Sequence, residues 1–346
     1  MNMITFDKDY VWKVAKELLQ IDSPSGFTHH AISYIESQIQ TFGFQYEKSK
    51  KGNLHVYVDG KKTEKTIGLS AHCDTLGLMV RSINSDGTLA VTNIGGPTLP
   101  TLDGAYCRII TRNQHIYTGT ILCRSASKHV HEDASTAPRD LHTLIVRIDE
   151  IVRSKEDVQA LGIEHGDMIA IDPKVEITTS DFIKSRFLDD KISVAALLGL
   201  LHAIHHHKII PTYNLVLIFS TYEEVGHGAS YIPPNIDELI SVDMGCIGED
   251  LACTEYDVSI CAKDSSGPYD YTITTNLITL AKQQNLAYAV DIYPMYGSDV
   301  SACLRAGYDI KGALIGPGVH ASHGMERTHY QAIENTMKLL LAYITM

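Results

Sequence analysis

Residues 214–228 constrain the fold of this chain more than any other segment. Five consecutive apolar residues, 215–219, precede Glu223 and Glu224, and Gly226 follows. The run is too short to span a bilayer and is typical of a strand buried on both faces of a parallel sheet. Ligands of open α/β sheets gather at the carboxyl ends of strands, where charged groups need a cation or hydrogen-bond donors. We therefore interpret the two glutamates as the centre of an active site.

The composition excludes several classes of protein. With 346 residues and 44% hydrophobic content, the chain is long enough to bury a full core in one large domain or two unequal ones. Its formal net charge of -12 argues against a general affinity for nucleic acid or for an anionic membrane. Residues 1–20 contain no apolar signal-peptide core, and no apolar run is long enough to cross a bilayer, so we expect a cytoplasmic protein without membrane partners. The seven cysteines are scattered and odd in number, which argues against a disulfide framework.

The segments before residue 77 carry helical and strand patterns. Apolar spacing and turn residues predict helices over 9–19 and 28–42 and strands over 44–47, 54–58 and 67–71. We expect the first two strands at the edge of the sheet. The third has the apolar pattern of a buried strand and runs directly into His72 and Asp74.

The pattern changes between residues 78 and 173. Short strand patterns divided by turn residues predict a small β-barrel or sandwich, inserted into an α/β domain made of residues 1–77 and 174–346. Within the insertion, residues 125–141 are expected to form a mobile loop. The loop carries His129, His131, Glu132 and Asp133. No ligand spacing links its histidines to other candidates, so we interpret them as solvated.

The α/β pattern resumes near residue 177. Asp189 and Asp190 lie at the start of an apolar helix over 192–204, where the helix dipole favours anions. The histidines at 205–207 end that helix, and cations are favoured at a helix C-terminus, so we do not interpret them as a metal site. Further strands are predicted over 239–243, 287–292 and 310–315, and a closing helix over 330–344.

Ligand-type side chains recur at the ends of the predicted strands and at one helix start. They are His72 with Asp74, Asp189, Glu223 with Glu224, and Asp243, and a fifth segment, 316–323, ends in His320 and His323. Because the carboxyl ends of parallel strands meet at one edge of a sheet, these groups are expected to converge. Imidazole and carboxylate together suit zinc, cobalt or manganese, so the sequence predicts a shared cation site.

These motifs, taken in their order, resemble a known family. The matching segments are 71–74, 187–191, 223–226, 242–243, 297–299 and 322–323. They resemble the M42 family of glutamyl and tetrahedral metallo-aminopeptidases, some of whose members are labelled endoglucanases, and the likeness spans nearly the whole chain. The resemblance implies an α/β fold, with a mixed, largely parallel sheet flanked by helices as in zinc peptidases, and an inserted small β-barrel domain.

The resemblance also implies a dinuclear site and its division of roles. His72 and Asp243 would hold one divalent cation, Glu224 and His323 the other, Asp189 would bridge the two, and Glu223 would be the general base. The chemistry favours the same division. Three carboxylates against two divalent cations leave one positive charge, which a bound hydroxide neutralises, and coordination lowers the pKa of that water towards about 7. The implied activity is removal of N-terminal residues from short peptides.

The local sequence adds two expectations about this site. Adjacent residues of a strand face opposite ways, so both glutamates reach the cations only if the strand ends before Glu223, and Gly226 and Gly228 fit such a bend. Asp74 lies two residues after His72, where its carboxylate is placed to accept the second imidazole N–H.

Several assignments stay open at the level of sequence. Asp190 either supports the site or caps the following helix, and we favour the cap. Either His320 or His323 is the last ligand, and we favour His323. Asp299 lies in a segment that resembles a family loop near the substrate, although a turn explains it nearly as well. His329 departs from the commonest family pattern and is a pocket residue, a subgroup feature or a structural residue.

Other functional classes fit the sequence less well than an aminopeptidase does. A glycoside hydrolase needs carboxyl groups on either side of a glycosidic bond, roughly 5 to 9.5 Å apart, which neighbours in sequence rarely satisfy. An inactive, metal-stabilised binding or assembly protein has no need of an unligated base such as Glu223. Neither Gly-x-Ser-x-Gly nor His-Glu-x-x-His occurs in the chain. By resemblance alone, the inserted domain would serve assembly and substrate access, with dimers building a dodecamer.

Overall fold

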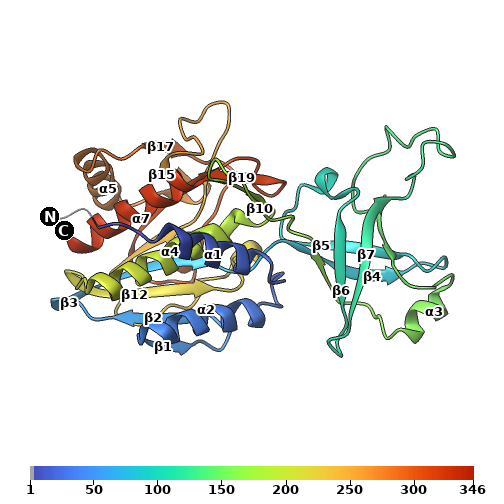
Figure 1. The fold of residues 1–346 in the computed structure, drawn as a ribbon, viewed down its shortest axis with the longest axis horizontal. Coiled ribbons are helices and arrows are strands. Elements are labelled where there is room, and N and C mark those ends of the chain that lie inside the picture. Colours follow the sequence, from blue (N-terminus) through green and yellow to red (C-terminus); the bar gives the residue numbers. More distant parts are fainter. Residues whose placement is uncertain (1–3) are drawn as a thin grey trace. The chain divides into compact units, whose positions relative to one another are not determined.

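A ten-stranded mixed sheet lies at the centre of the larger of two units (Figure 1). The computed structural model describes residues 4–346, so residues 1–3 of the predicted catalytic domain lie outside the described part. The described residues up to Asp74 form the larger unit together with Lys174–Met346, and Thr75–Pro173 form the second unit.

The four central strands of the sheet are parallel. In order across the sheet they are β12 (Tyr213–Ser220), β3 (Lys62–His72), β13 (Glu238–Val242) and β18 (Lys311–Val319). Beyond β12 follow β2 (Leu54–Val58) and β1 (Gln45–Lys48), each antiparallel to its neighbour. Beyond β18 lie β15 (Val258–Asp264) and β16 (Gly267–Pro268), while β14 (Gly245–Cys246) pairs with β18 and β17 (Tyr288–Ile292) pairs with β15. The predicted mixed, largely parallel sheet with β1 and β2 at one edge is confirmed.

Helices cover both faces of this sheet. They are α1 (Lys8–Leu19), α2 (His29–Phe42), α4 (Leu188–His207), α5 (Tyr271–Gln283), α6 (Asp299–Arg305) and α7 (Tyr330–Thr345). On one face α4 contacts β3 and β18, and α1, α2 and α7 pack around it. On the other face Val300 and Cys303 of α6 join an apolar cluster with Val216 and Ile218 of β12. Among residues 4–346, every helix is too short or too polar to span a bilayer.

The apolar composition of helix α4 follows from its burial. Every residue from Leu188 to Leu201 is buried, so this part of the helix has no exposed polar face, and from Ile192 to Leu201 its side chains are small or aliphatic. Asp189 and Asp190 have non-helical backbone angles, with ψ of 102° and 22°. The two acids therefore lie at the start of the regular helix, as the sequence predicts.

The register of the central strands places their carboxyl ends together. Ser220, the last residue of β12, lies opposite His72, the last residue of β3. In the next pairs, Ser241 of β13 lies opposite Ser70, and Val242 lies opposite Ile315 of β18. The segments that follow these strands therefore leave the sheet at one edge, as the sequence predicts.

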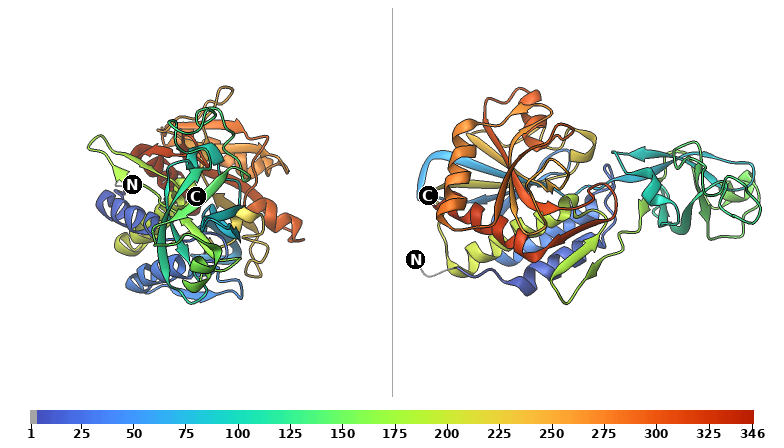
Figure 2. Two further views of the ribbon diagram at one scale, coloured as in Figure 1. Left: turned by 90° about the vertical axis from the view of Figure 1, so that its right-hand side faces the viewer. Right: turned by 90° about the horizontal axis from the view of Figure 1, so that it is seen from above.

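The second unit is a closed antiparallel barrel, which can be followed from two further sides in Figure 2. Its strands, in order around the barrel, are β4 (Gly77–Ile83), β5 (Leu89–Ile94), β8 (Leu144–Ile148), β7 (Ile116–Cys123), β6 (Tyr106–Ile110) and β9 (Met168–Ile171). It also contains η1 (Leu99–Leu102) and α3 (Lys155–Ala160). Alternating apolar residues of the strands fill the barrel, so the prediction of an inserted β-barrel is confirmed. Residues 125–141 contain no helix or strand, and His129 and His131 are exposed.

A small sheet completes the larger unit. It consists of β10 (Glu176–Ile177), β11 (Phe182–Ser185) and β19 (Glu326–His329), all antiparallel. Strand β11 leads into the start of α4, which carries Asp189 and Asp190. Strand β19 follows the segment that carries His323. This sheet therefore joins two segments that approach the edge of the large sheet from different parts of the chain.

Candidate metal centre

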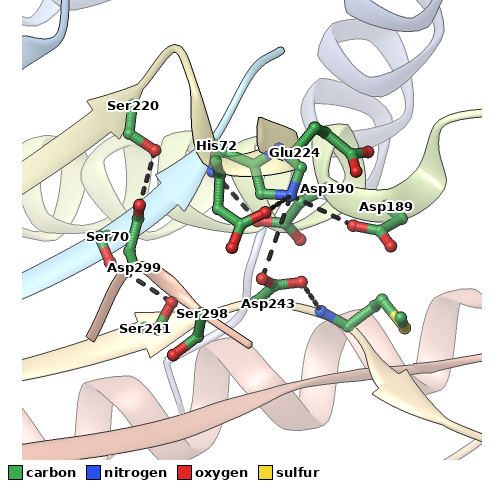
Figure 3. Close-up of polar contacts among 12 residues, drawn as sticks. Ser70, His72, Asp189, Asp190, Ser220, Glu224, Ser241, Asp243, Ser298 and Asp299 are labelled. Atoms are coloured by element: carbon green, nitrogen blue, oxygen red, sulfur yellow. Dashed lines mark hydrogen bonds and ion pairs between the residues drawn. The ribbon is translucent and has the colours of Figure 1, made fainter. Parts of the chain in front are cut away.

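The predicted ligands reach one site from five different segments, and most of them are labelled in Figure 3. His72 ends β3, Asp189 lies among the non-helical first residues of α4, Glu224 lies in the 3-10 turn η2 (Glu223–Val225) after β12, Asp243 follows β13, and His323 follows β18. His72, Asp189 and Asp243 are nearly inaccessible, at 1%, 6% and 4% exposure. A charged group in such surroundings requires compensation, so the cluster is a candidate cation site.

Asp189 faces both imidazoles with different oxygens. Its Oδ1 lies 3.2 Å from Nε2 of His72, and its Oδ2 lies 3.4 Å from Nε2 of His323. A carboxylate in this arrangement has one oxygen for each of two cations. The bridging role that the family resemblance implies for Asp189 needs this arrangement, and it stays a prediction.

The remaining ligand candidates divide between the two imidazoles. Asp243 Oδ2 lies 4.0 Å from Nε2 of His72, and Glu224 Oε2 lies 3.7 Å from Nε2 of His323. Donors about 2.1 Å from a tetrahedral cation lie roughly 3.4 Å from one another, so these spacings suit shared coordination. Oε1 of Glu224 is buried and has no hydrogen-bond partner, which fits an oxygen that awaits a cation. The imidazole and carboxylate donors present thus fit zinc, cobalt or manganese.

The electrostatics of the carboxylates point the same way. Burial raises the pKa of Glu223 and Glu224 well above the usual range, and neighbouring carboxylates contribute in the same direction. Burial and the charge of Asp189 raise the pKa of Asp243 to about 7. Burial acts on Asp189 as well, but hydrogen bonds from His323 and His72 hold its pKa below the usual range. The protein alone therefore supplies too little positive charge for this cluster, and divalent cations would supply it.

Main-chain contacts orient His72 towards the cluster. Its Nδ1 lies 3.0 Å from the main-chain oxygen of Asp74, which only accepts hydrogen bonds, so Nδ1 carries the hydrogen and Nε2 is left to bind a cation. The Asp74 carboxylate is farther from Nδ1, at 3.5 Å, than the sequence suggests.

The Asp74 carboxylate instead holds the turn that carries both glutamates. Its Oδ1 accepts the N–H of Glu223 at 3.1 Å and its Oδ2 accepts the N–H of Glu224 at 3.3 Å, and Ser25 donates to Oδ2 as well. The strand has already ended at Ser220, and Gly226 has a φ of 84°, so the expected bend is present. Asp74 thus acts on the glutamates through their backbone.

Glu326 is a member of the site that sequence reasoning missed. Its Oε2 accepts the N–H of Asp189 at 3.0 Å and its Oε1 accepts the N–H of His323 at 2.9 Å. One buried carboxylate therefore connects the backbone of two ligand candidates. Burial and the charge of Asp189 raise its pKa to about 8. A signal was present, because Glu326 is an acid three residues after His323, but this spacing is also common in surface turns.

The residues that were left open by the sequence now have defined surroundings. Asp190 is fully buried, its Oδ2 accepts the N–H of His72 at 3.2 Å, and its Oδ1 has no hydrogen-bond partner, so it supports the site and the favoured role as a helix cap is not observed. His320 is exposed and its backbone pairs with Arg327, whereas His323 faces Asp189. His329 caps α7, where its Nδ1 accepts the N–H of Gln331 at 3.1 Å.

Asp299 and one glycine hold the loop after the glutamates. Asp299 is buried, and its carboxylate accepts the Ser220 hydroxyl at 2.7 Å (Figure 3). It also accepts the Ala229 N–H at 2.8 Å. A Cβ at position 228 would lie 2.3 Å from Asp299 Oδ1, so only glycine allows this approach. Asp299 therefore brackets the glutamate turn from both sides.

Gly316 of β18 allows the backbone of Asp243 to lie close to that strand. A Cβ at position 316 would lie 1.9 Å from the main-chain oxygen of Asp243. The N–H of Asp243 donates to Ile315 at 2.9 Å, so the two backbones touch where the ligand leaves the sheet. A glycine is thus required next to Asp243.

Several known proteins resemble this chain in sequence or in fold. A family model described as M42 glutamyl aminopeptidase matches residues 52–339. The Bacillus subtilis protein named "Putative aminopeptidase YhfE" is 46% identical over 96% of each chain. Among solved structures, an aminopeptidase from Desulfurococcus kamchatkensis has a TM-score of 0.86 at 23% identity, with 97% of this chain and 94% of the other covered. The TET1 peptidase of Pyrococcus horikoshii, whose description says that it can assemble into a tetrahedron or a large octahedral shell, has a TM-score of 0.84 at 22% identity, with 96% and 99% covered.

Proposed function

The chain belongs to the M42 glutamyl aminopeptidase family, and from this premise we propose that it removes N-terminal residues from short peptides with the help of two divalent cations. Aminopeptidase function is supported by the family model and by the names of the relatives, and M42 aminopeptidases are metal-dependent. The observation that carries the dinuclear proposal is Asp189, whose two oxygens face the imidazoles of His72 and His323.

Five residues would hold the two cations. His72 and Asp243 would hold the first, Glu224 and His323 the second, and Asp189 would contact both. When bound, the cations would supply Lewis acidity that polarises the scissile carbonyl and lowers the pKa of water. His72 is fixed in the required tautomer by the Asp74 main-chain oxygen at 3.0 Å. Asp74, Asp190 and Glu326 hold the backbone of the ligand segments, so the site is organised before substrate arrives.

Glu223 is the proposed general base. Its carboxylate reaches the edge of the cluster, with Oε2 3.8 Å from Nε2 of His72. The side chain is 16% exposed, whereas that of Glu224 is 4% exposed, so Glu223 is the more accessible of the two to water and substrate. Burial raises its pKa, and a base with a raised pKa accepts a proton from water and returns it to the leaving amine near neutral pH. The adjacent glutamates therefore have different roles.

The glycoside hydrolase alternative has less support. Its mechanism uses two carboxyl groups placed across a glycosidic bond and gives no task to two imidazoles. Here His72 and His323 lie on the two sides of one carboxylate, which is an arrangement for cations. We also propose that the protein forms a homo-oligomer and that the barrel unit serves assembly and substrate access, because solved structures with this fold include TET assemblies.

A matched pair of variants tests the proposal. Glu223→Gln is expected to keep both cations and to lower kcat by roughly 10² to 10⁴, since it removes only the base. Glu224→Gln is expected to lose metal together with activity. Metal content by mass spectrometry and release of amine from aminoacyl nitroanilides are measured for both variants and for the wild type, with and without chelator. Full activity in both variants, or chelator-resistant cleavage of glycosyl nitrophenols by the wild type, would refute the proposal.

A further inference from the structure

An apolar surface lies beside the candidate metal centre and has no role in the proposed mechanism. It is formed by Cys246, Leu251 and Tyr296, which we call the apolar wall. These partly exposed side chains pack against a buried cluster of Cys261, Tyr293 and Leu314. The wall is therefore backed by a packed core and has a fixed shape.

Hydrogen bonds fix Tyr296 next to Asp243. The Tyr296 hydroxyl donates to the main-chain oxygen of Met244 at 3.0 Å, and the N–H of Met244 donates to Oδ1 of Asp243 at 2.7 Å. The Tyr296 ring also lies 5.4 Å from the ring of Tyr293, which is only 2% exposed. Tyr296 is thus connected to the proposed ligand Asp243 through a single residue, Met244.

Cys246 brings the wall close to both sides of the centre. It follows Asp243 by three residues, and on β14 it pairs with Val319, at the end of the strand that leads to His323. It is the partly exposed member of the seven cysteines, all of which lie in the described residues. Burial and the carboxylates of Asp189 and Asp243 raise the pKa of its thiol to about 12, so at neutral pH it is an uncharged, small, polarisable group.

Charged side chains near the wall are directed elsewhere or exposed. Lys263 follows Cys261 on β15, but its ammonium donates to the main-chain oxygen of Asp264 at 2.8 Å. Glu249 and Asp250 are exposed on the loop between Cys246 and Leu251. The carboxylates of Asp189 and Asp243 also act on Cys246, but in the proposed site both hold cations. A charged substrate side chain on the wall would therefore lose water without gaining an opposite charge, which is unfavourable.

We propose that the apolar wall contacts the side chain of the substrate's N-terminal residue and selects uncharged, apolar residues such as leucine, methionine or phenylalanine. This inference rests on the proposed function. In an aminopeptidase the N-terminal amine and the scissile carbonyl both lie at the metal centre, so the side chain between them must lie within a few bonds of Asp243. The wall is an apolar surface that adjoins Asp243 through Tyr296 and Met244.

A substrate panel tests the preference. The metal-loaded wild type is given leucyl, methionyl, phenylalanyl, glutamyl and lysyl nitroanilides, and kcat/KM is measured for each. The best apolar substrate is expected to exceed both charged substrates at least tenfold. Equal or better cleavage of the glutamyl or lysyl substrate would overturn this inference and leave the aminopeptidase proposal intact. Absence of cleavage of all five would instead overturn the proposed function, and this inference with it.

Two variants locate the preference in the wall. Cys246→Lys is expected to lower kcat/KM for the leucyl substrate at least tenfold, mainly through KM, and to raise the glutamyl to leucyl ratio at least tenfold, with metal content unchanged. The matched control Glu249→Lys adds positive charge to the same exposed loop and is expected to change that ratio less than threefold. An unchanged ratio in Cys246→Lys, or the same change in both variants, would overturn the inference.

A second variant covers the case in which Cys246→Lys fails to fold. Leu251→Lys adds the same charge to another member of the apolar wall. It is expected to raise the glutamyl to leucyl ratio of kcat/KM at least threefold, with metal content unchanged, whereas Glu249→Lys is not. An unchanged ratio in Leu251→Lys would overturn the inference.

Discussion

The metal centre and the loop at 125–141 have similar residue types and opposite surroundings. Both contain two histidines and several acids within a short distance in sequence or space. In the metal centre the acids are buried and their backbones are held by Asp74, Asp190 and Glu326. In the loop, His129, His131, Glu132 and Asp133 are exposed. The difference shows that ligand-type residues make a site only where the fold removes them from water and fixes their geometry.

The source of that fixation is the sheet edge. The parallel strands end side by side, so His72, Glu224 and Asp243 lie at the same edge of the sheet. The chain leaves each strand there, and its backbone N–H and C=O groups need new hydrogen-bond partners. Buried carboxylates supply these partners and at the same time add negative charge. The carboxylates that hold the backbone therefore also add negative charge that cations must neutralise. The loop at 125–141 has neither the backbone support nor the buried charge.

The largest effect is expected from the bridging carboxylate. Asp189→Asn keeps the size of the side chain but removes its charge, so we expect loss of at least one cation and a fall in kcat/KM of roughly a thousandfold, because several kcal/mol of Lewis-acid stabilisation is lost. Metal content and activity are measured in the same preparation. Asp133→Asn in the loop is the matched control and is expected to change neither. Wild-type metal content in Asp189→Asn would contradict the assignment.

A smaller effect is expected from Glu326, which contacts the ligand segments only through their backbone. In Glu326→Gln the amide NH₂ would face one of the two N–H groups that the carboxylate now accepts. We expect metal affinity to fall by roughly 10 to 100-fold, as for other groups that orient ligands. Competition with a chromogenic chelator measures this, with Glu132→Gln as the exposed counterpart. An affinity equal to that of the wild type would show that the backbone contacts do not position the ligands.

His55 provides an intermediate case, since it is buried without a site around it. It lies on β2 at 0% exposure, and neither ring nitrogen makes a hydrogen bond, although the Glu47 carboxylate lies 3.7 Å from Nδ1 and partly offsets the effect of burial on its pKa. Burial lowers its pKa, so below the unfolded value of about 6.5 the unfolded chain binds a proton that the folded chain resists, and stability falls as the pH falls. His55→Phe is expected to remove up to about 1.4 kcal/mol per pH unit of this dependence. Urea unfolding at pH 7.5 and pH 5.5 tests it, and an unchanged difference between the two pH values would contradict it.

The smallest effect is expected in the loop itself. The double variant His129→Ala with His131→Ala removes two exposed imidazoles, so its free energy of unfolding should stay within about 0.5 kcal/mol of the wild type. Metal content and kcat/KM should be unchanged. A loss of one cation per chain in this variant would mean that the loop binds metal after all.

The sequence predicted those parts of the molecule whose signal is local. Apolar spacing predicted α1 and α2, and runs such as 215–219 predicted the buried strands, because burial on both faces leaves a continuous apolar pattern. Helix α5 was not predicted, since its four threonines and two isoleucines have low helix propensity and its packing on β15 and α7 stabilises it instead.

For the candidate site, sequence order brought the ligand types together but not their supporting contacts. The contact between Glu326 and Asp189 joins residues that are 137 positions apart, and no local pattern encodes it. The same holds for Asp74, whose carboxylate was expected on an imidazole and lies on the backbone of Glu223 and Glu224 instead. Such contacts depend on the register of distant strands.

The close approach at Gly316 has a consequence for mutational scanning. Position 316 carries no functional group, yet one added methyl group would collide with the main chain of Asp243 and push apart the strands that lead to Asp243 and His323. Substitutions there should therefore inactivate the protein as completely as loss of a ligand does. A screen that reads only activity would place this glycine among the catalytic residues, and only a count of bound metal in each folded variant, set beside its backbone geometry, would reveal it as a spacer.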